Sequence, residues 1–242
     1  MNAIESHGLT KRYREALAVD RLDLCVRKGE LFSLLGVNGA GKTTTIKMLS
    51  CLTAPTAGDA LLMGKSIQAE PTAVKALIAV SPQETAIAKG LSVRENLELM
   101  CGVHGFSKEK RQRKIEELTA LLGLSDILSR KAGKLSGGWQ RRLSIAMALI
   151  SEPQILFLDE PTLGLDVIAR SELWDLIRSL KGHVTIVLTT HYMEEAEALS
   201  DRVAIMRDGR LLICDTPDAI KQAAGSDRFE DAFIRIVKGV SA

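Results

Sequence analysis

The sequence contains no uninterrupted apolar run that approaches the roughly 18–20 residues of a membrane-spanning helix. Its first residues, MNAIESHGLTKRY, also have no apolar stretch of the kind found in secretory signal peptides. Charge of one sign is not in excess, because 32 basic and 30 acidic residues give a formal net charge of +2. This balance provides no general attraction to nucleic acid or to anionic lipid. If the protein works at a membrane, we expect a separate chain to cross it.

Cysteine is scarce, with four residues in 242, namely Cys25, Cys51, Cys101 and Cys214. No two of them have the CxxC spacing of a zinc clip or a redox pair, which argues against both kinds of site. We interpret them as small buried thiols in a reducing cytosol.

Several short apolar runs predict strands buried on both faces of a parallel sheet. They cover residues 31–36, 76–81, 155–158 and 184–190. Helical segments separate most of these runs, which predicts an α/β core with a mixed sheet. Residues 4–13, 22–30 and 202–215 instead alternate apolar and polar side chains, which is typical of antiparallel hairpins.

One region interrupts this alternation of strands and helices. Residues 92–151 contain helical patterns and no strand signal, and Ser92 with Glu95 forms a capping box at the first helix. We therefore predict an all-helical insertion between two core strands. Near the C-terminus, Thr216 and Pro217 are typical of an N-cap and a first helical residue, and residues 228–239 predict a short amphipathic helix.

A phosphate-binding loop follows the first buried run. The stretch GVNGAGKT matches GxxxxGK[ST] and opens a helical segment, which is the context this motif requires. Its glycines let backbone N–H groups surround phosphate oxygens, while Lys42 reaches the terminal phosphates and Thr43 offers a hydroxyl to Mg²⁺. We predict that this phosphate cradle binds nucleotide through Gly36, Val37, Asn38, Gly39, Ala40, Gly41, Lys42, Thr43 and Thr44.

Two acids end the buried run ILFLDE. Ligands of open α/β sheets bind at the carboxyl ends of strands, where Asp159 and Glu160 would lie. Consecutive strand residues point to opposite sides, so the two carboxylates can have different roles. Asp159 suits the Mg²⁺ shell, and Glu160 suits the attacking water as a general base or an orienting group. The alternative is an acidic pair that caps the following turn, which the neighbouring cradle makes the weaker interpretation.

In this order, GVNGAGKT, LSGGWQ and ILFLDEPTLGLD resemble the motifs of the nucleotide-binding subunit of ABC transporters. Gln83 in SPQE and His191 in TTH fit the same family, and the resemblance spans nearly the whole chain. It implies a P-loop NTPase core, RecA-like, with an antiparallel β subdomain and a helical subdomain. As one such domain, residues 1–91 and 152–215 would form the core, 92–151 the helical subdomain and 216–242 a helical tail.

The resemblance also implies roles for individual residues. Tyr13 would stack on adenine, Gln83 would contact the γ-phosphate and Mg²⁺, and His191 would help to hold the attacking water. Asp166 would communicate across a dimer, although it is also a natural N-cap for the helix that follows it. Ser136, Gly137 and Gly138, here called the SGG segment, would close over nucleotide. Trp139 departs from the usual LSGGQ, and we interpret it as packing at a helix start.

In this family two subunits pack head to tail, so that the SGG segment of one completes the phosphate site of the other. Two ATP molecules with Mg²⁺ would then lie in a two-fold interface with two equal composite sites. The resemblance further implies a separate transmembrane permease, a peripheral location at the cytoplasmic face of the membrane, and no nucleic acid partner.

Segments such as LSVRENLELMCGVHGF resemble the drug- and polysaccharide-exporting branch, so we expect an ATPase that powers export. One alternative is a cytosolic ABC ATPase acting on nucleic acid or ribosomes, which the basic run 108–114 would serve. At helical spacing beside Ile115 and Leu118, that run is more typical of a solvated helix face. Another alternative is a small-molecule kinase, against which the paired SGG and Asp-Glu motifs argue.

Overall fold

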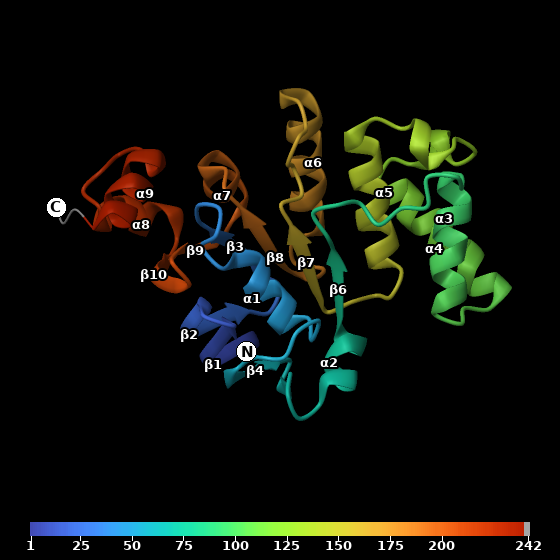
Figure 1. Cartoon of the computed structure of the whole chain (residues 1–242). Helices are drawn as coiled ribbons and strands as arrows, with labels where there is room; N and C mark the ends of the chain where they lie inside the picture. The colour runs from blue at the N-terminus through green and yellow to red at the C-terminus, as the bar shows by residue number, and fades with distance from the viewer. Residues whose placement is uncertain (240–242) are drawn as a thin grey trace.

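The computed structural model describes residues 1–239 and contains two sheets with helices packed around them (Figure 1). The larger sheet has six strands in the order β10 (Arg210–Asp215), β9 (Arg202–Arg207), β3 (Leu31–Leu35), β8 (Thr185–Thr190), β7 (Ile155–Asp159) and β6 (Ile78–Ser81). The smaller, antiparallel sheet has the order β2 (Ala16–Arg27), β1 (Asn2–Tyr13), β4 (Ala57–Leu62) and β5 (Lys65–Ser66).

Strands β9, β3, β8, β7 and β6 run parallel, and β10 alone pairs antiparallel, with β9. Every residue of β3, β7 and β8 is buried, as the continuous apolar runs predict. The predicted antiparallel hairpins are present as β1 with β2 and β9 with β10. Two predicted segments have wrong boundaries. The segment predicted over 22–30 is β2, which begins at Ala16 and ends at Arg27, and in the run 76–81 Ala76 and Leu77 complete helix α2 (Pro71–Leu77), so that β6 starts at Ile78. Periodicity alone cannot divide a short apolar run between the end of a helix and a strand.

Helix α1 (Lys42–Leu49) lies between the two sheets, and its residues Ile46, Met48 and Leu49 share one core with both. Helices α3 (Val93–Val103), α4 (Lys108–Leu121), α5 (Gly137–Leu149) and α6 (Val167–Leu180) pack with the other face of the larger sheet in a second core. A third, smaller core joins β3 and β9 to α7 (Met193–Leu199), α8 (Pro217–Ala223) and α9 (Phe229–Lys238).

The stretch predicted to be helical holds α3, α4, α5 and two 3₁₀ turns, Ser125–Ile127 and Ala132–Lys134. Helix α3 begins with the predicted capping box, in which the Glu95 backbone N–H donates to Ser92 Oγ at 3.2 Å and the Ser92 N–H donates to Glu95 Oε2 at 2.6 Å. Hydrogen bonds from the Ser92 backbone N–H, the Ser92 hydroxyl and the Lys131 ammonium lower the pKa of the Glu95 carboxyl to about 2. The cap therefore fixes where the chain leaves the sheet for the helical region.

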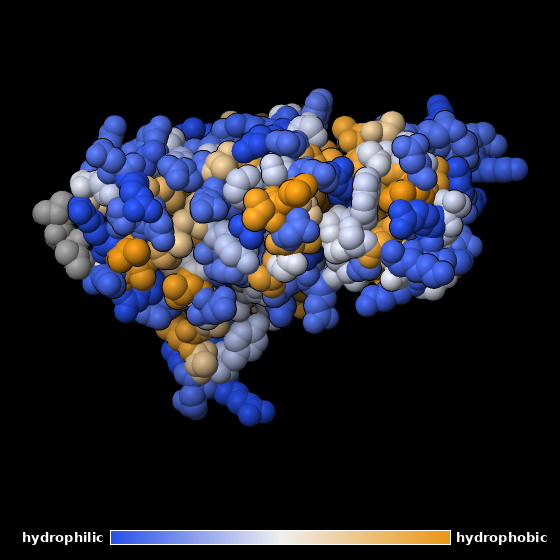
Figure 2. Space-filling view, turned by 90° about the horizontal axis from the view of Figure 1, so that it is seen from above, coloured by the Kyte–Doolittle hydropathy of each residue, from blue (hydrophilic) through white to orange (hydrophobic). Residues whose placement is uncertain are grey.

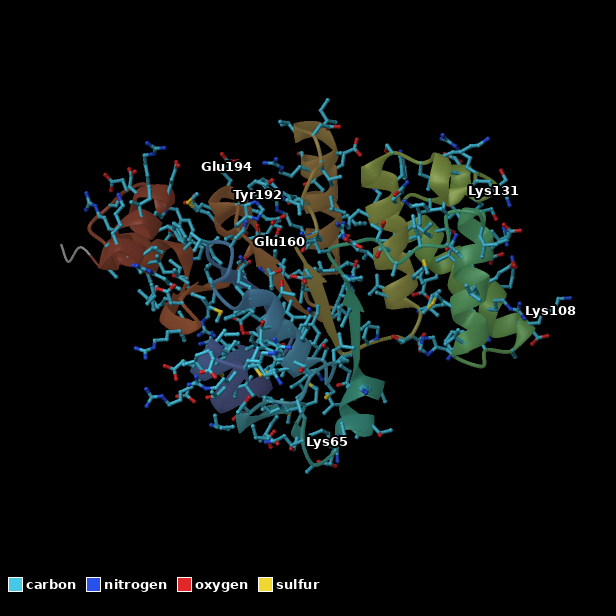
Figure 3. The ribbon with its side chains drawn as sticks, in the orientation of Figure 1. Lys65, Lys108, Lys131, Glu160, Tyr192 and Glu194 are labelled. Atoms are coloured by element: carbon cyan, nitrogen blue, oxygen red, sulfur yellow. The ribbon has the colours of Figure 1, made fainter. Side chains whose placement is uncertain are left out.

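The basic run lies on α4, where Lys108 reaches the outer edge of the helical cluster (Figure 3). The run is largely solvent-exposed, but Lys114 is buried and its ammonium lies 3.0 Å from carboxylates of both Glu117 and Glu152. Part of the positive charge of the basic run is therefore used in ion pairs within the chain.

The C-terminal segment forms two helices. Thr216 caps α8 by accepting the Ala219 N–H, with Pro217 as the first helical residue, as predicted. Helix α9 is the predicted amphipathic helix, and it buries Phe229, Ala232 and Phe233 against the third core. Residues 240–242 of the predicted tail lie outside the described residues. Within residues 1–239, no helix combines the length and apolar character that crossing a membrane requires.

Candidate functional site

The carboxyl ends of four neighbouring parallel strands meet at one edge of the larger sheet. The cradle follows β3, His191 follows β8, Glu160 follows β7, and Gln83 lies two residues beyond β6. The sheet order β3-β8-β7-β6 therefore brings together motifs separated by more than a hundred residues of sequence. In Figure 3, Glu160 lies near the centre of the molecule at this edge.

The cradle is a loop in which two glycines, Gly36 and Gly41, have no room for a side chain. A Cβ on Gly36 would lie 2.4 Å from the Met206 carbonyl oxygen, and one on Gly41 would lie 2.5 Å from the Ala18 carbonyl oxygen. Gly41 is also the N-cap of α1, with a left-handed φ of 100°. The first N–H groups of α1 therefore face the loop, and a helix N-terminus of this kind attracts anions.

Gly41→Ala should destabilise the nucleotide-free protein more than Gly39→Ala does. Both positions have positive φ, so each alanine should cost about 1–2 kcal/mol of backbone strain. Only Gly41 has a backbone oxygen in the way, whereas a Cβ on Gly39 meets no atom within 4 Å. Overpacking should add about 1–3 kcal/mol at Gly41. Thermal melting without nucleotide checks this difference, and equal melting temperatures would contradict it.

Lys42 extends from the first turn of α1 into the cradle and is 5% exposed. Its ammonium donates to the Gly36 carbonyl at 2.7 Å and the Val37 carbonyl at 3.3 Å, and lies 3.8 Å from Glu160 Oε1. Burial lowers the pKa of Lys42, while the carboxylates of Glu160 and Asp159 act in the opposite direction. The site thus holds a desolvated cation ready for an anionic ligand.

Asp159 and Thr43 form an oxygen-rich pair next to Lys42. The Thr43 hydroxyl donates to Asp159 Oδ1 at 3.2 Å, and the Thr189 hydroxyl donates to the same oxygen at 2.5 Å. A hydroxyl and a carboxylate are hard oxygen ligands, and Mg²⁺ commonly binds one or two carboxylates together with substrate phosphates. No cluster of three or more His, Cys, Asp or Glu residues exists among residues 1–239 that would hold a metal without such phosphates. The residues present fit a magnesium–nucleotide complex.

Glu160 contacts a second functional candidate, His191. The His191 Nδ1 lies 3.1 Å from Glu160 Oε2, which leaves the two side chains together at the mouth of the site. The Glu160 backbone is left-handed, with φ 47°, and its N–H donates to the Thr189 carbonyl at 3.1 Å and hydroxyl at 3.0 Å. Such a conformation is costly for a non-glycine residue, and Thr189 holds it in place. The Glu160 carboxylate thus meets His191 and Lys42, while the Asp159 carboxylate meets Thr43 and Thr189. Strand alternation does not explain this difference, because β7 ends at Asp159 and Glu160 lies beyond it in the left-handed conformation.

One cavity of about 590 Å³ connects these groups. It is lined by Tyr13, Ala18, Asn38, Gly39, Ala40, Gly41, Lys42, Thr43, Thr44, Gln83, Glu160, Leu163 and His191. Tyr13 lies at the end of β1 and is 44% exposed, with the Lys11 ammonium 5.0 Å from its ring centroid. An exposed aromatic face at the rim of a phosphate-binding cavity is suited to stacking on a base.

Seven predicted site residues do not line this cavity. Gly36, Val37 and Asp159 hydrogen-bond to Lys42 or Thr43 in its lining, whereas Ser136, Gly137, Gly138 and Asp166 belong to the starts of α5 and α6. Helix α5, which carries the SGG segment, lies beyond α6 from α1 in Figure 1. Gly137 and Gly138 also have an intramolecular role that the sequence did not reveal. A Cβ on Gly137 would lie 3.3 Å from Leu165 Cδ2, and one on Gly138 would lie 3.2 Å from Ala169 Cβ, so the glycines allow α5 to approach α6 closely.

Ser136 differs from the other Ser, Thr and Asp N-caps among the described residues. The side chains of Ser92, Ser107, Asp166 and Thr216 each accept a backbone N–H at the start of their helix. Ser136 has N-cap geometry but makes no such bond, and it is solvent-exposed. Its hydroxyl is therefore available to an external acceptor. Trp139 is partly buried against the helical core, with the Arg142 guanidinium 5.0 Å from its ring centroid.

Figure 2 looks onto the upper face of the molecule and shows a largely hydrophilic surface interrupted by apolar patches. At the start of α6, Val167 and Ile168 are 78% and 73% exposed. Exposed apolar side chains at the start of the helix that packs against Gly138 are typical of a surface that another protein covers.

The sequence did not single out Thr189, although it contacts both acids of the site. Its only signal was the pair of threonines in VLTTH, at the carboxyl end of a buried strand. A threonine in a strand is ordinarily assigned to β-propensity, so its two hydrogen bonds become visible only when β7 and β8 are known to be neighbours.

Known proteins are similar to this chain along nearly its whole length. A sequence model of the family described as ABC transporter matches residues 19–163. The daunorubicin/doxorubicin resistance ATP-binding protein DrrA of Streptomyces peucetius is 41% identical over 226 residues, which are 93% of this chain and 68% of that protein.

Solved structures agree with this result. The structure of an ATP-binding subunit of an ABC transporter has a TM-score of 0.84 and 27% identity, and the match covers 97% of this chain and 99% of that one. A dimeric post-hydrolysis state of the ATP-binding cassette MJ0796, bound to ADP and Pi, has a TM-score of 0.78 and 26% identity, covering 88% and 98%. These likenesses confirm the fold class that the sequence predicts.

Proposed function

This chain belongs to the ABC transporter family of ATPases, and we propose that it powers an exporter through a separate transmembrane permease. The observation that carries the proposal is the single cavity shared by the cradle, Gln83, Glu160 and His191. It combines a phosphate site with a carboxylate and an imidazole beside the buried lysine, an arrangement suited to positioning a water for ATP hydrolysis.

Within this cavity we assign each group a role toward ATP. Lys42 and the cradle amides would bind the β- and γ-phosphates, and Tyr13 would stack on adenine. Thr43, Asp159 and Gln83 would hold Mg²⁺, which supplies charge neutralisation to the phosphates when it is bound. Glu160 would orient and deprotonate the attacking water, and His191, 3.1 Å from it, would hold that arrangement.

A second copy of this chain would complete the site. The uncapped hydroxyl of Ser136 and the amides of Gly137 and Gly138 would donate to the γ-phosphate bound at the partner's cradle. Asp166 already caps α6 by accepting the Ala169 N–H at 2.9 Å, and it can keep this bond while facing a partner. The dimeric state of the structurally similar MJ0796 cassette supports a two-fold assembly.

The relatives favour export as the direction of transport. DrrA of Streptomyces peucetius is named for resistance to daunorubicin and doxorubicin. YbhF of Escherichia coli, 38% identical over 97% of this chain and 41% of that protein, is named a probable multidrug ABC transporter ATP-binding protein. A role in nucleic acid or ribosome metabolism has no comparable support. The protein would act at the cytoplasmic face of the membrane, with residues 92–151 as a helical subdomain on the core formed by 1–91 and 152–215.

Cysteine crosslinking tests the contact with the permease. Residues 84–94 follow Gln83 and join the core to the capped start of α3, so we expect the permease to dock there. A cysteine at exposed Lys89 should crosslink to the permease in membranes that contain both chains, whereas one at exposed Asp218 on α8 should not. Crosslinking found only at Asp218 would overturn this docking site.

A further inference from the structure

Arg141 is a buried cation on α5 that contacts the backbone beside Gln83. It is 5% exposed, and its Nη1 and Nη2 donate to the carbonyls of Pro82 and Gln83, each at 2.7 Å. The two bonds come from one planar guanidinium to two consecutive carbonyls, a fork that a lysine ammonium does not reproduce. Helix α5 is thereby attached to the segment that carries Gln83 into the nucleotide cavity.

Burying this charge is costly, which indicates that the contact has a purpose beyond packing. Burial lowers the pKa of Arg141, and the carboxylates of Asp159 and Glu195 act in the opposite direction. The bonded atoms are nevertheless neutral carbonyls rather than carboxylates. An apolar side chain would fill such a place without desolvating a charge, but it would not fix the direction of the Gln83 backbone.

A further hydrogen bond joins α5 to the end of β6, one turn further along the helix. The hydroxyls of Ser144 and Ser81 lie 3.0 Å apart, and both side chains are buried. Helix α5 is therefore tied to the end of β6 at two points, with Arg141 at the edge nearer the nucleotide cavity. Two contacts along one helix restrict its rotation against the strand more than one contact does.

The start of α5 is also tied to the loop that precedes the SGG segment. Gln140, next to Arg141, donates from Nε2 to the Leu135 carbonyl at 3.0 Å and the Ala132 carbonyl at 3.3 Å. These bonds hold the loop that leads into Ser136. Arg141 bonds to the backbone at Gln83, and its neighbour Gln140 bonds to the backbone before Ser136. The two backbone segments therefore belong to one hydrogen-bonded unit that is centred on α5.

We propose that Arg141 is a positioning residue that makes the placement of Ser136–Gly138 depend on the placement of Gln83. The inference rests on the function proposed above, in which Gln83 contacts the ligand in its own cavity and Ser136 contacts the ligand of the partner. Arg141 touches neither nucleotide. It links the two composite sites of the dimer, because a shift of the Gln83 backbone moves α5 and the SGG segment with it.

Arg141→Gln tests this link, with Arg142→Gln as the matched control. Arg142 is the next residue of α5, but its guanidinium pairs with Glu172 on α6 at 2.9 Å, away from Gln83. Arg141→Gln should keep the Kd for ATP, measured on protein purified without nucleotide, within about twofold of the wild-type value. It should lower kcat by about 10- to 100-fold, and it should lower the ATP-induced dimer fraction in a Glu160→Gln background. Arg142→Gln should leave kcat and the dimer fraction near wild type.

Binding and turnover separate a positioning role from general damage. A fall in ATP affinity equal to the fall in kcat, or an Arg141→Gln protein that dimerises and turns over like Arg142→Gln, would overturn the inference. If Arg141→Gln does not fold, Arg141→Lys replaces it and should also lower kcat at unchanged ATP affinity, whereas wild-type kcat would overturn the inference. Wild-type protein that neither dimerises with ATP nor hydrolyses it would instead refute the proposed function.

Discussion

Replacing Glu160 by Gln should reduce steady-state ATP hydrolysis by about 10²- to 10⁴-fold, the range that a general base contributes. An amide has the size of the carboxylate but cannot accept the proton of the attacking water. Lys42 keeps its bonds to the Gly36 and Val37 carbonyls, so the cradle retains its shape when the 3.8 Å ion pair to Glu160 is lost. ATP should therefore still bind, and the protein should accumulate as an ATP-bound dimer. Phosphate release and size-exclusion chromatography with ATP measure the two effects.

Glu194→Gln provides the control for this change. Glu194 is an exposed carboxylate on α7, three residues after His191, and it lies in the same region as Glu160 and Tyr192 in Figure 3. Its replacement removes the same charge from the neighbourhood but should leave turnover within about twofold, as is usual for surface substitutions. Wild-type turnover in Glu160→Gln would show that another group activates the water. Loss of ATP binding would show that Glu160 mainly shapes the cradle.

The cradle and the two acids were predictable from sequence because their chemistry depends on local spacing. GxxxxGKT places Lys42 and Thr43 in the first turn of a helix whatever the rest of the fold does. Asp159 and Glu160 end a continuous apolar run, and parallel sheets bind ligands at such ends. The α/β core followed from the same buried runs, whereas the P-loop NTPase fold followed from the resemblance of the motifs to a known family. What these patterns do not contain is the order of the strands.

Strand order decides which side chains meet, and the sequence therefore missed contacts that depend on it. Thr189 bonds both acids only because β8 lies between β3 and β7. Arg141 resembled one more cation in the polar run QRR, yet it is buried because α5 packs on the end of β6. The resemblance assigned the Gly137–Gly138 pair to closure over nucleotide, whereas the pair also lets α5 approach α6 closely. In each case the missing information was a neighbour distant in sequence.

Mixing two inactive variants should restore ATP hydrolysis if each site is shared between two copies. Lys42→Ala removes the cradle cation, and Ser136→Asp sets a carboxylate against the γ-phosphate of the partner, a like-charge contact that costs several kcal/mol. Asp is as good an N-cap as Ser, so α5 should still form. Half of randomly formed dimers contain one copy of each variant, and one of their two sites is then intact. Activity should rise from about 1% or less to about a quarter of wild type.

A second mixture discriminates between residues on the same chain and residues on different chains. Lys42 and Glu160 line one cavity of one copy, 3.8 Å apart, so Lys42→Ala mixed with Glu160→Gln leaves no intact site and should stay inactive. Ser136 is exposed outside that cavity, and this separation is what permits rescue in the first mixture. Equal rescue in both mixtures would mean that Lys42 and Glu160 do not serve the same ATP. Rescue in neither would mean that Ser136 acts within its own chain or that one site cannot turn over beside a defective one, and either result would refute a shared site that can turn over in such a dimer.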